Sequence, residues 1–179
     1  MGLIGENGAG KSTTIKAMLD LIRKDDGTVT FWGRKLSDSK QLKEDIGVVF
    51  EQGNFYETLT STQIGSISAA AYTQWDQATY EGYLTRFQLP KDKALKTFSN
   101  GMRTKLGIAV ALSHHPKLLI LDEATSGLDP VVREDILDVF WEFVQDEHHS
   151  ILMSSHITSD LEKIADYITF LHQGKLLFC

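Results

Sequence analysis

A glycine-rich segment near the start of the chain has the residue types and spacing of a phosphate-binding loop. Residues 5–12 read GENGAGKS and fit the Walker A pattern, G-x-x-x-x-G-K-[S/T], in full. Glycines let successive backbone N–H groups turn toward a polyphosphate, and the helix that follows directs its N-terminal dipole at the anion. Lys11 offers a positive charge to the outer phosphates, and the Ser12 hydroxyl is a ligand for Mg²⁺. The predicted phosphate-binding residues are Gly5, Glu6, Asn7, Gly8, Ala9, Gly10, Lys11, Ser12 and Thr13.

The alternative for this segment is a glycine-rich turn that leads into an ordinary helix. The motif lies between the apolar pair Leu3-Ile4 and an amphipathic segment, and that context favours the phosphate site.

Two carboxylates follow an apolar run later in the chain. Leu118–Leu121 is continuously apolar, as is typical of a strand buried on both faces, and Asp122 and Glu123 come directly after it. Ligands of open α/β folds bind at the carboxyl edge of the sheet, so Asp122 is predicted to serve Mg²⁺ beside Ser12. Glu123 is predicted to polarise the attacking water as a general base. A solvated acidic loop explains the pair equally well by itself, and the Walker A motif decides for the metal site.

His156 follows another predicted strand, Ile151–Ser154, at the same edge of the sheet. A single histidine is more often a surface or core residue, but this position favours contact with the γ-phosphate or the attacking water. The adjacent histidine pairs at 114–115 and 148–149 have diverging side chains, and no metal site is predicted from them.

Apolar periodicity indicates which elements position these groups. A helix is predicted after the Walker A loop, with Gly27 at its end, from the spacing of Ile15, Met18, Leu19 and Ile22. Thr28–Trp32 and Ile46–Phe50 are predicted strands. The polar segment from about 53 to 97 is predicted to be a helical insertion with exposed aromatic side chains, which are Phe55, Tyr56, Tyr72, Trp75, Tyr80, Tyr83 and Phe87.

The alternation of strands and helices resumes in the second half and implies a largely parallel sheet. Asp129 is predicted to cap a helix that starts at Pro130, and residues 159–162 have capping-box spacing for the next helix. A closing hairpin turns at Gln173-Gly174. Two helix faces are predicted, one from Met102, Leu106, Ala109, Val110 and Leu112 and one from Val132, Ile136, Val139, Phe140 and Phe143.

Composition limits the class of protein. The chain has 179 residues, the length of one domain, and a formal net charge of 18 − 24 = −6, which argues against a general nucleic-acid binder. No apolar run approaches the ~20 residues of a spanning helix, so a membrane role requires a partner. The single cysteine, Cys179, excludes an internal disulfide and fits a reducing cytosol.

Taken together, these motifs resemble the ATP-binding cassette (ABC) ATPase family over nearly the whole chain. Residues 98–102, FSNGM, are similar to the family signature LSGGQ. The resemblance implies that Ser99, Asn100, Gly101 and Met102 bind the γ-phosphate of an ATP held by the opposite subunit, whereas the residues alone favour a simple N-capped helix. Residues 126–129 resemble the D-loop, which crosses the dimer interface, and His156 matches the switch histidine.

The chain departs from the family pattern in three places. The variant signature looks like the branch that includes bacterial drug, bacteriocin and lantibiotic exporters. The Q-loop glutamine, a metal-sensing residue, corresponds either to Glu51 or to Gln52. In the family, antiparallel strands and an adenine-stacking aromatic precede Walker A; only Met1–Ile4 precede it here, so an N-terminally truncated domain is expected.

The resemblance implies an α/β fold, a P-loop NTPase with a mostly parallel sheet flanked by helices and a small helical subdomain. Residues 1–179 would form one nucleotide-binding domain, with about 53–115 as the helical subdomain. The implied activity is hydrolysis of ATP with Mg²⁺, to power a transporter, most simply an exporter. The implied partners are a second ABC subunit, identical or related, and a transmembrane permease that holds the protein at the cytoplasmic face of the membrane.

Three alternatives stay open. A soluble ABC protein of translation or DNA repair would normally carry two cassettes or a long coiled coil. A non-catalytic fragment would bind ATP weakly, because missing edge strands leave backbone groups unpaired. A nucleoside kinase has no place for the signature or for His156.

Overall fold

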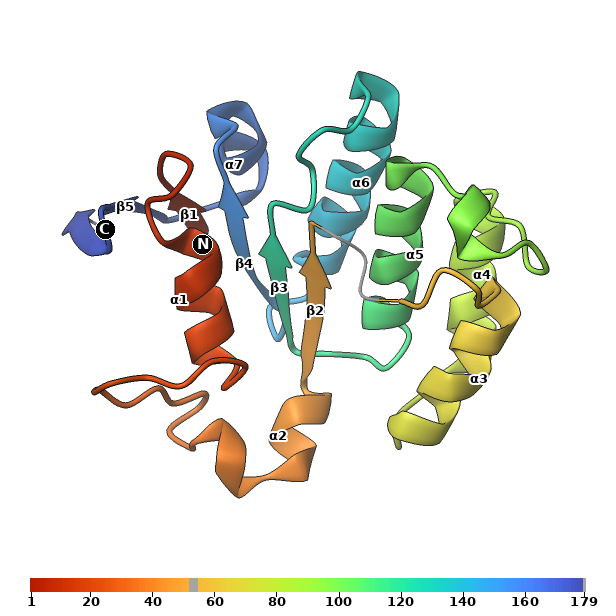
Figure 1. Cartoon of the computed structure of the whole chain (residues 1–179), viewed down its shortest axis with the longest axis horizontal. Helices are drawn as coiled ribbons and strands as arrows, with labels where there is room; N and C mark the ends of the chain where they lie inside the picture. Colours follow the sequence, from red (N-terminus) through yellow and green to blue (C-terminus); the bar gives the residue numbers. More distant parts are fainter. Residues whose placement is uncertain (52–54, 179) are drawn as a thin grey trace.

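A six-stranded sheet forms the centre of the computed structural model, which describes residues 1–51 and 55–178 (Figure 1). The strand order is β2-β3-β4-β1-β5-β6, with five parallel strands and an antiparallel β6 that closes a hairpin with β5. The largely parallel sheet and the hairpin are therefore confirmed. The strands are β1 Gly2–Ile4, β2 Ile46–Phe50, β3 Leu118–Asp122, β4 Ser150–Ser155, β5 Ile168–His172 and β6 Lys175–Phe178.

Helices cover both faces of this sheet. Ile120 of β3 packs with Ile15 of α1 on one face, whereas the neighbouring Leu119 and Leu121 join the cluster formed with α5 and α6 on the other. Burial on both faces explains why β3 reads as an uninterrupted apolar run. The helices are α1 Lys11–Met18, α2 Lys40–Glu44, α3 Ser61–Ala71, α4 Gln77–Arg86, α5 Asn100–Leu112, α6 Pro130–Phe143 and α7 Thr158–Ile164.

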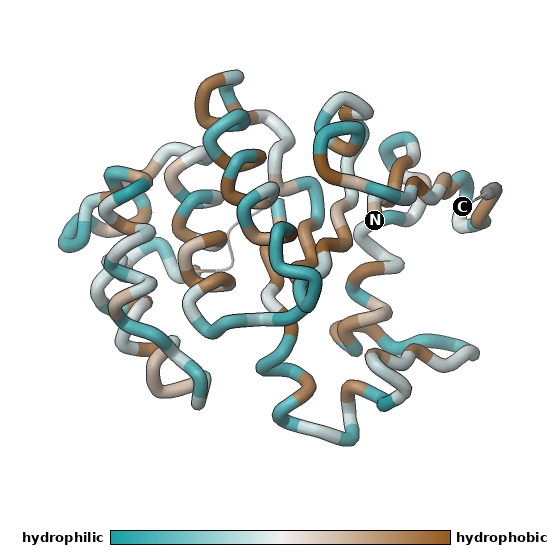
Figure 2. The backbone as a smooth tube through the Cα atoms, turned by 180° about the vertical axis from the view of Figure 1, so that it is seen from behind, coloured by the Kyte–Doolittle hydropathy of each residue, from teal (hydrophilic) through white to brown (hydrophobic). Residues whose placement is uncertain are grey.

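Apolar residues follow the same arrangement along the backbone. Figure 2 shows brown segments concentrated in the central strands and on the sides of the helices that face the sheet. Teal segments lie on the loops and on the outer sides of the helices. Among the described residues, no helix combines the length and the apolar character needed to cross a bilayer.

The prediction that Gly27 ends α1 was wrong, because the helix stops at Met18. Asp20 adopts a left-handed conformation with φ of 55°. The Leu21 N–H donates to the Lys16 carbonyl at 2.9 Å, and the Asp20 N–H donates to the Ala17 carbonyl at 3.3 Å. These two bonds form a Schellman motif, in which aspartate takes the place that glycine usually occupies.

The predicted strand Thr28–Trp32 was also wrong. Within the described residues this segment makes only an isolated bridge between Phe31 and Arg34. A β-prone sequence becomes a strand only beside a pairing partner, and the described strands pair with one another instead.

Two of the aromatic side chains predicted to be exposed are core residues. Tyr80 of α4 is 1% exposed, and its hydroxyl donates to the Ser61 carbonyl at the start of α3 at 2.8 Å. Phe87 is likewise buried, while Tyr56 is 81% exposed. A Cβ on Gly65 would lie 2.6 Å from the Tyr80 ring, so α3 and α4 touch at this glycine. Tyr80 and Phe87 therefore pack inside the helical segment, although its weak apolar periodicity did not predict them as core residues.

The capping box predicted at residues 159–162 was wrong as well. Helix α7 begins at Thr158 with Ile157 at its N-cap. The Ser159 hydroxyl instead accepts a hydrogen bond from Arg133 Nη2 at 3.1 Å. A long-range contact with α6 thus replaces the local cap.

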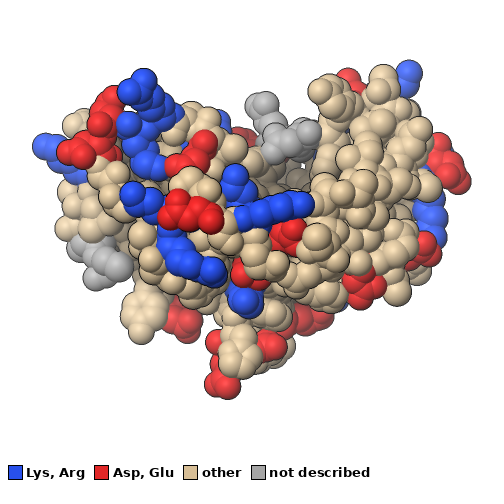
Figure 3. Space-filling view, turned by 90° about the horizontal axis from the view of Figure 1, so that it is seen from below, with Lys and Arg blue, Asp and Glu red and all other residues tan. Residues whose placement is uncertain are grey.

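Charged side chains are unevenly spread over the surface. Seen from below, Lys and Arg gather on one half of the face, and Asp and Glu are interspersed among them (Figure 3). The other half of this face is uncharged over its centre and has charged side chains along its edge (Figure 3). Because carboxylates lie among the Lys and Arg side chains, the positive potential of these basic groups is partly neutralised.

Candidate functional site

The loop between β1 and α1 has the backbone geometry of an anion-binding turn. Gly8 and Gly10 have φ of 83° and 108°, values that side chains with a Cβ rarely adopt. A Cβ on Gly5 would lie 2.4 Å from the Leu171 carbonyl oxygen, so only glycine fits there. Gly10 is the N-cap of α1 and carries no capping side chain, which leaves the first-turn N–H groups open to an external acceptor.

Lys11 lies across this loop and is 5% exposed. Its Nζ donates to the Gly5 carbonyl at 2.7 Å and to the Glu6 carbonyl at 3.3 Å. The same Nζ is 3.1 Å from Glu123 Oε1. The ammonium group is therefore held at the mouth of the loop, where it can balance the charge of a phosphate.

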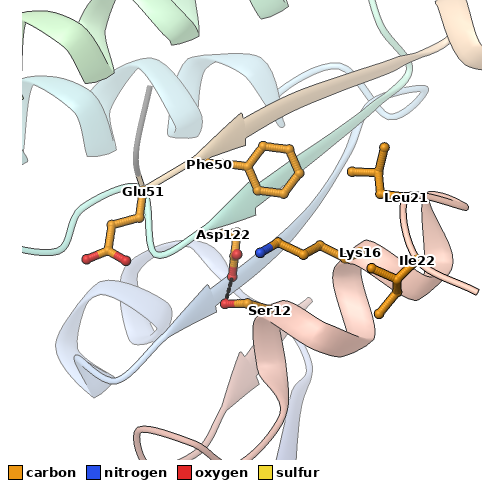
Figure 4. Close-up of a pocket in the computed structure, with 7 residues that line it drawn as sticks. All are labelled: Ser12, Lys16, Leu21, Ile22, Phe50, Glu51 and Asp122. Carbon is orange, nitrogen blue, oxygen red and sulfur yellow. Dashed lines mark hydrogen bonds between the residues drawn. The ribbon is translucent and has the colours of Figure 1, made fainter. Parts of the chain in front are cut away.

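Ser12 and Asp122 meet at the carboxyl edge of the sheet, as predicted. The Ser12 hydroxyl donates to Asp122 Oδ1 at 2.9 Å (Figure 4). The Ser154 hydroxyl donates to the same oxygen at 2.7 Å. Strand register explains the second contact, because Asp122 of β3 is paired with Ser154 of β4. A hydroxyl and a carboxylate are hard oxygen donors, so this pair fits Mg²⁺.

Glu123 faces away from this pair, toward Lys11 and His156. Its Oε2 lies 2.8 Å from His156 Nδ1, and its side chain is 10% exposed. The backbone of Glu123 is left-handed, with φ of 53°. Its N–H donates to both the carbonyl (3.2 Å) and the hydroxyl (3.1 Å) of Ser154. These contacts fix an unfavourable backbone conformation that turns the carboxylate toward the loop.

An open cavity of about 680 Å³ adjoins the Ser12–Asp122 pair. This volume is in the ordinary range of small-molecule and cofactor sites. Figure 4 shows the Lys16 side chain reaching toward Asp122, with Leu21 and Ile22 on one wall and Phe50 on another. The sequence prediction missed all four side chains, although Lys16 is four residues from Ser12 and therefore on the same helix face.

Of the two candidates for the Q-loop position, the structure places one. Glu51 follows β2 and lines the same cavity as Ser12 and Asp122. Gln52 lies outside the described residues. The metal-sensing role of either residue stays a prediction.

The signature residues lie apart from the phosphate loop. Asn100 lines a neighbouring cavity of about 560 Å³, together with Arg103, Ser126 and Gly127, and Glu51 lines both this cavity and the one beside Ser12. A Cβ on Gly101 would lie 3.1 Å from Val132 Cγ1, which shows how closely α5 approaches α6. The phosphate-binding role of Ser99, Asn100, Gly101 and Met102 stays a prediction, because the chain does not bring them to Lys11.

Ser99 itself is the N-cap of α5. Its hydroxyl accepts a hydrogen bond from the Met102 N–H at 3.2 Å. Asp129 caps α6 in the same way, by accepting from the Val132 N–H at 3.0 Å. The helix-capping interpretation of both residues is therefore confirmed.

Replacement of Ser99 by alanine is expected to lower the free energy of unfolding by about 1 kcal/mol, because one first-turn N–H loses its acceptor. Chemical denaturation measures the change. Ser99→Asn, which keeps a capping oxygen, is the matched control and is expected to stay within a few tenths of a kcal/mol of the wild type. Equal losses in both variants would contradict the capping role.

Comparison with known proteins finds the family that the motifs of this chain resemble. The family model described as "ABC transporter" matches residues 1–126. The bacitracin transport ATP-binding protein BcrA of Bacillus licheniformis is 36% identical over 179 residues, which cover 98% of this chain and 58% of that protein. The lantibiotic transport ATP-binding protein SrtF of Streptococcus pyogenes is 37% identical over 177 residues, which cover 98% of this chain and 76% of that protein.

A solved structure, described as the ATP-binding subunit of an ABC transporter, has the same fold. It superposes with a TM-score of 0.81 at 32% identity, over 98% of this chain and 75% of that one. The chain thus spans less than two thirds of the first curated relatives, and about three quarters of this structural neighbour.

Proposed function

The chain belongs to the ABC transporter family, and on this basis we propose that it binds ATP with Mg²⁺ and hydrolyses it to ADP and phosphate. One observation carries the proposal. Lys11, the Ser12–Asp122 pair and the Glu123–His156 pair, from three separate parts of the sequence, converge at one edge of the sheet.

Each of these groups has a distinct task in the proposed reaction. Lys11 and the first-turn N–H groups of α1 bind the phosphates and offset the charge that develops on them. Ser12 and Asp122 hold Mg²⁺, which when bound neutralises charge between the outer phosphates. Glu123 accepts a proton from the attacking water, and His156 steadies the γ-phosphate.

We further propose that two nucleotide-binding domains sandwich two ATP molecules. Support comes from the lining of the cavity beside Ser12 and Asp122, which among the described residues includes none of Ser99, Asn100, Gly101 and Met102. A second domain would supply a signature to that phosphate loop. Residues 126–129 would then cross the interface. The second domain is either another copy of this chain or a relative.

Hydrolysis would power export through a transmembrane permease, with the protein held at the cytoplasmic face of the membrane by that partner. The support comes from relatives whose names place them in bacitracin and lantibiotic transport. The variant signature FSNGM fits the same branch.

Substitution of the proposed metal residue tests this function. Asp122→Asn keeps an oxygen for the two serine hydroxyls but removes the charge, so the Mg²⁺ concentration for half-maximal phosphate release is expected to rise at least about tenfold. Asp45→Asn is the matched control, since Asp45 is also a buried carboxylate, 5% exposed, but precedes β2 at the opposite end of the sheet. An unchanged Mg²⁺ dependence in Asp122→Asn would contradict the assignment.

A further inference from the structure

A buried carboxylate outside the residues used so far links three elements of the molecule. Asp160 of α7 is 1% exposed. Its Oδ2 accepts a hydrogen bond from the Thr125 hydroxyl at 2.7 Å, and its Oδ1 accepts from Arg133 Nε at 2.7 Å and also from Arg133 Nη2. Both oxygens of this carboxylate are thus used, and its charge is balanced by a guanidinium from α6.

Thr125 ties this network to Glu123. Thr125 is itself 1% exposed and lies two residues after Glu123 in the chain. The Ser126 N–H donates to the Glu123 carbonyl at 3.0 Å, so residues 123–126 form one tight turn. Because Glu123 holds a left-handed backbone, the turn needs anchors on both sides; Ser154 provides one and Asp160, through Thr125, provides the other.

Asp160 is also tied to His156. The two residues are four positions apart in the chain, and the Asp160 N–H donates to the Ile157 carbonyl at 3.3 Å. The Ile157 N–H in turn donates to the Ser155 hydroxyl at 3.0 Å. The loop that carries His156 is therefore short and closed at both ends, and the position of Asp160 limits the position of His156.

We propose that Asp160, together with Arg133 and Thr125, is a positioning group that sets the geometry of Glu123 relative to His156 and so governs turnover rather than nucleotide affinity. The inference rests on the proposed ATPase function. The hydrogen bonds among Thr125, Asp160 and Arg133 do not include Lys11, Ser12 or Asp122, and among the described residues the network reaches Lys11 only through Glu123. Phosphate and metal binding are therefore expected to survive its loss.

Thr125→Val tests this proposal, because it keeps the shape of the side chain and removes the hydrogen bond to Asp160. Its kcat for phosphate release is expected to fall about tenfold, as small misplacements of reacting groups do, with KM for ATP within about twofold of the wild type. Thr125→Ser, which keeps the hydroxyl, is expected to restore kcat. The matched control is Tyr80→Phe, which removes another buried hydrogen bond, far from Glu123 in the helical segment.

A second readout does not depend on turnover. The ¹⁵N resonance of His156 Nδ1, assigned with a His156→Gln variant, is expected to shift in Thr125→Val and to stay in place in Tyr80→Phe. Wild-type kcat in Thr125→Val, an unmoved resonance, or an equal loss of kcat in Tyr80→Phe would overturn the positioning role. If the wild-type protein releases no phosphate, the proposed function fails, while the resonance still reports whether the network positions His156.

Discussion

Glu123→Gln is expected to release phosphate about 1,000-fold more slowly than the wild type, the size of effect typical of a lost general base. Glutamine has the same shape as glutamate but cannot accept the proton of the attacking water. In the structure the carboxylate is held in place at the phosphate loop, 3.1 Å from Lys11 Nζ and 2.8 Å from His156 Nδ1. Steady-state phosphate release at saturating ATP and Mg²⁺ measures the effect.

ATP binding by the same variant is expected to be retained or strengthened, because a negative charge beside the phosphates has been removed. Glu44→Gln is the matched control. Glu44 is a buried glutamate, 4% exposed, in α2, and its carboxylate accepts from the Thr73 N–H, well away from Lys11. Rates equal to wild type in Glu123→Gln would exclude Glu123 as the base.

Lys11→Ala is expected to weaken ATP binding about 100-fold and to abolish measurable turnover. Loss of one partner of a desolvated charge pair typically costs roughly 2–5 kcal/mol, and each 1.4 kcal/mol is a factor of ten. Lys11 is the cation at the mouth of the phosphate loop, and it is nearly buried there. Equilibrium binding of a fluorescent ATP analogue measures the loss.

Lys105→Ala is the control for removal of a lysine. Lys105 is also poorly exposed, at 11%, and pairs with Asp135 at 2.9 Å on the α5–α6 side of the molecule. The affinity of the Lys105→Ala variant for ATP is expected to match that of the wild type. Wild-type affinity in Lys11→Ala would show that the loop binds no triphosphate.

The positions of the site residues were predicted from the sequence more accurately than the bounds of several helices and strands around them. The Walker A pattern predicts Lys11, and Asp122 and His156 are predicted at the same edge because each follows a buried strand and parallel strands bring their carboxyl ends together. That inference requires only the positions of the strands along the chain, which the apolar runs indicate. The partners of Glu123 could not be predicted, because they depend on its left-handed backbone.

Predictions from local sequence patterns were wrong where a long-range contact, or the lack of a pairing strand among the described residues, determined the secondary structure. Thr28–Trp32 has the composition of a strand but no pairing strand beyond the Phe31–Arg34 bridge in the described chain. Ser159 has the spacing of a cap but binds Arg133 of α6 instead. Gly27 looks like a helix end, yet Asp20 had already ended the helix with a Schellman motif. No single-sequence pattern contains these tertiary contacts.

The Thr125–Asp160 contact is another long-range contact that the sequence alone did not predict. The two residues are 35 positions apart, and neither lies in a motif that the sequence singled out for chemistry. Lys16 and Phe50, in contrast, could have been found from helix periodicity and from the end of β2.

A crystal structure of Glu123→Gln grown with ATP and Mg²⁺ is the most direct test of the central claim, that the Walker A loop and the acidic strand end form one nucleotide site. The expected result is a triphosphate on the N–H groups of residues 8–13, with Lys11 Nζ bonded to its outer phosphates and Mg²⁺ at the Ser12 hydroxyl beside Asp122. A triphosphate bound elsewhere, or Mg²⁺ remote from Ser12 and Asp122 with the loop empty, would contradict the account.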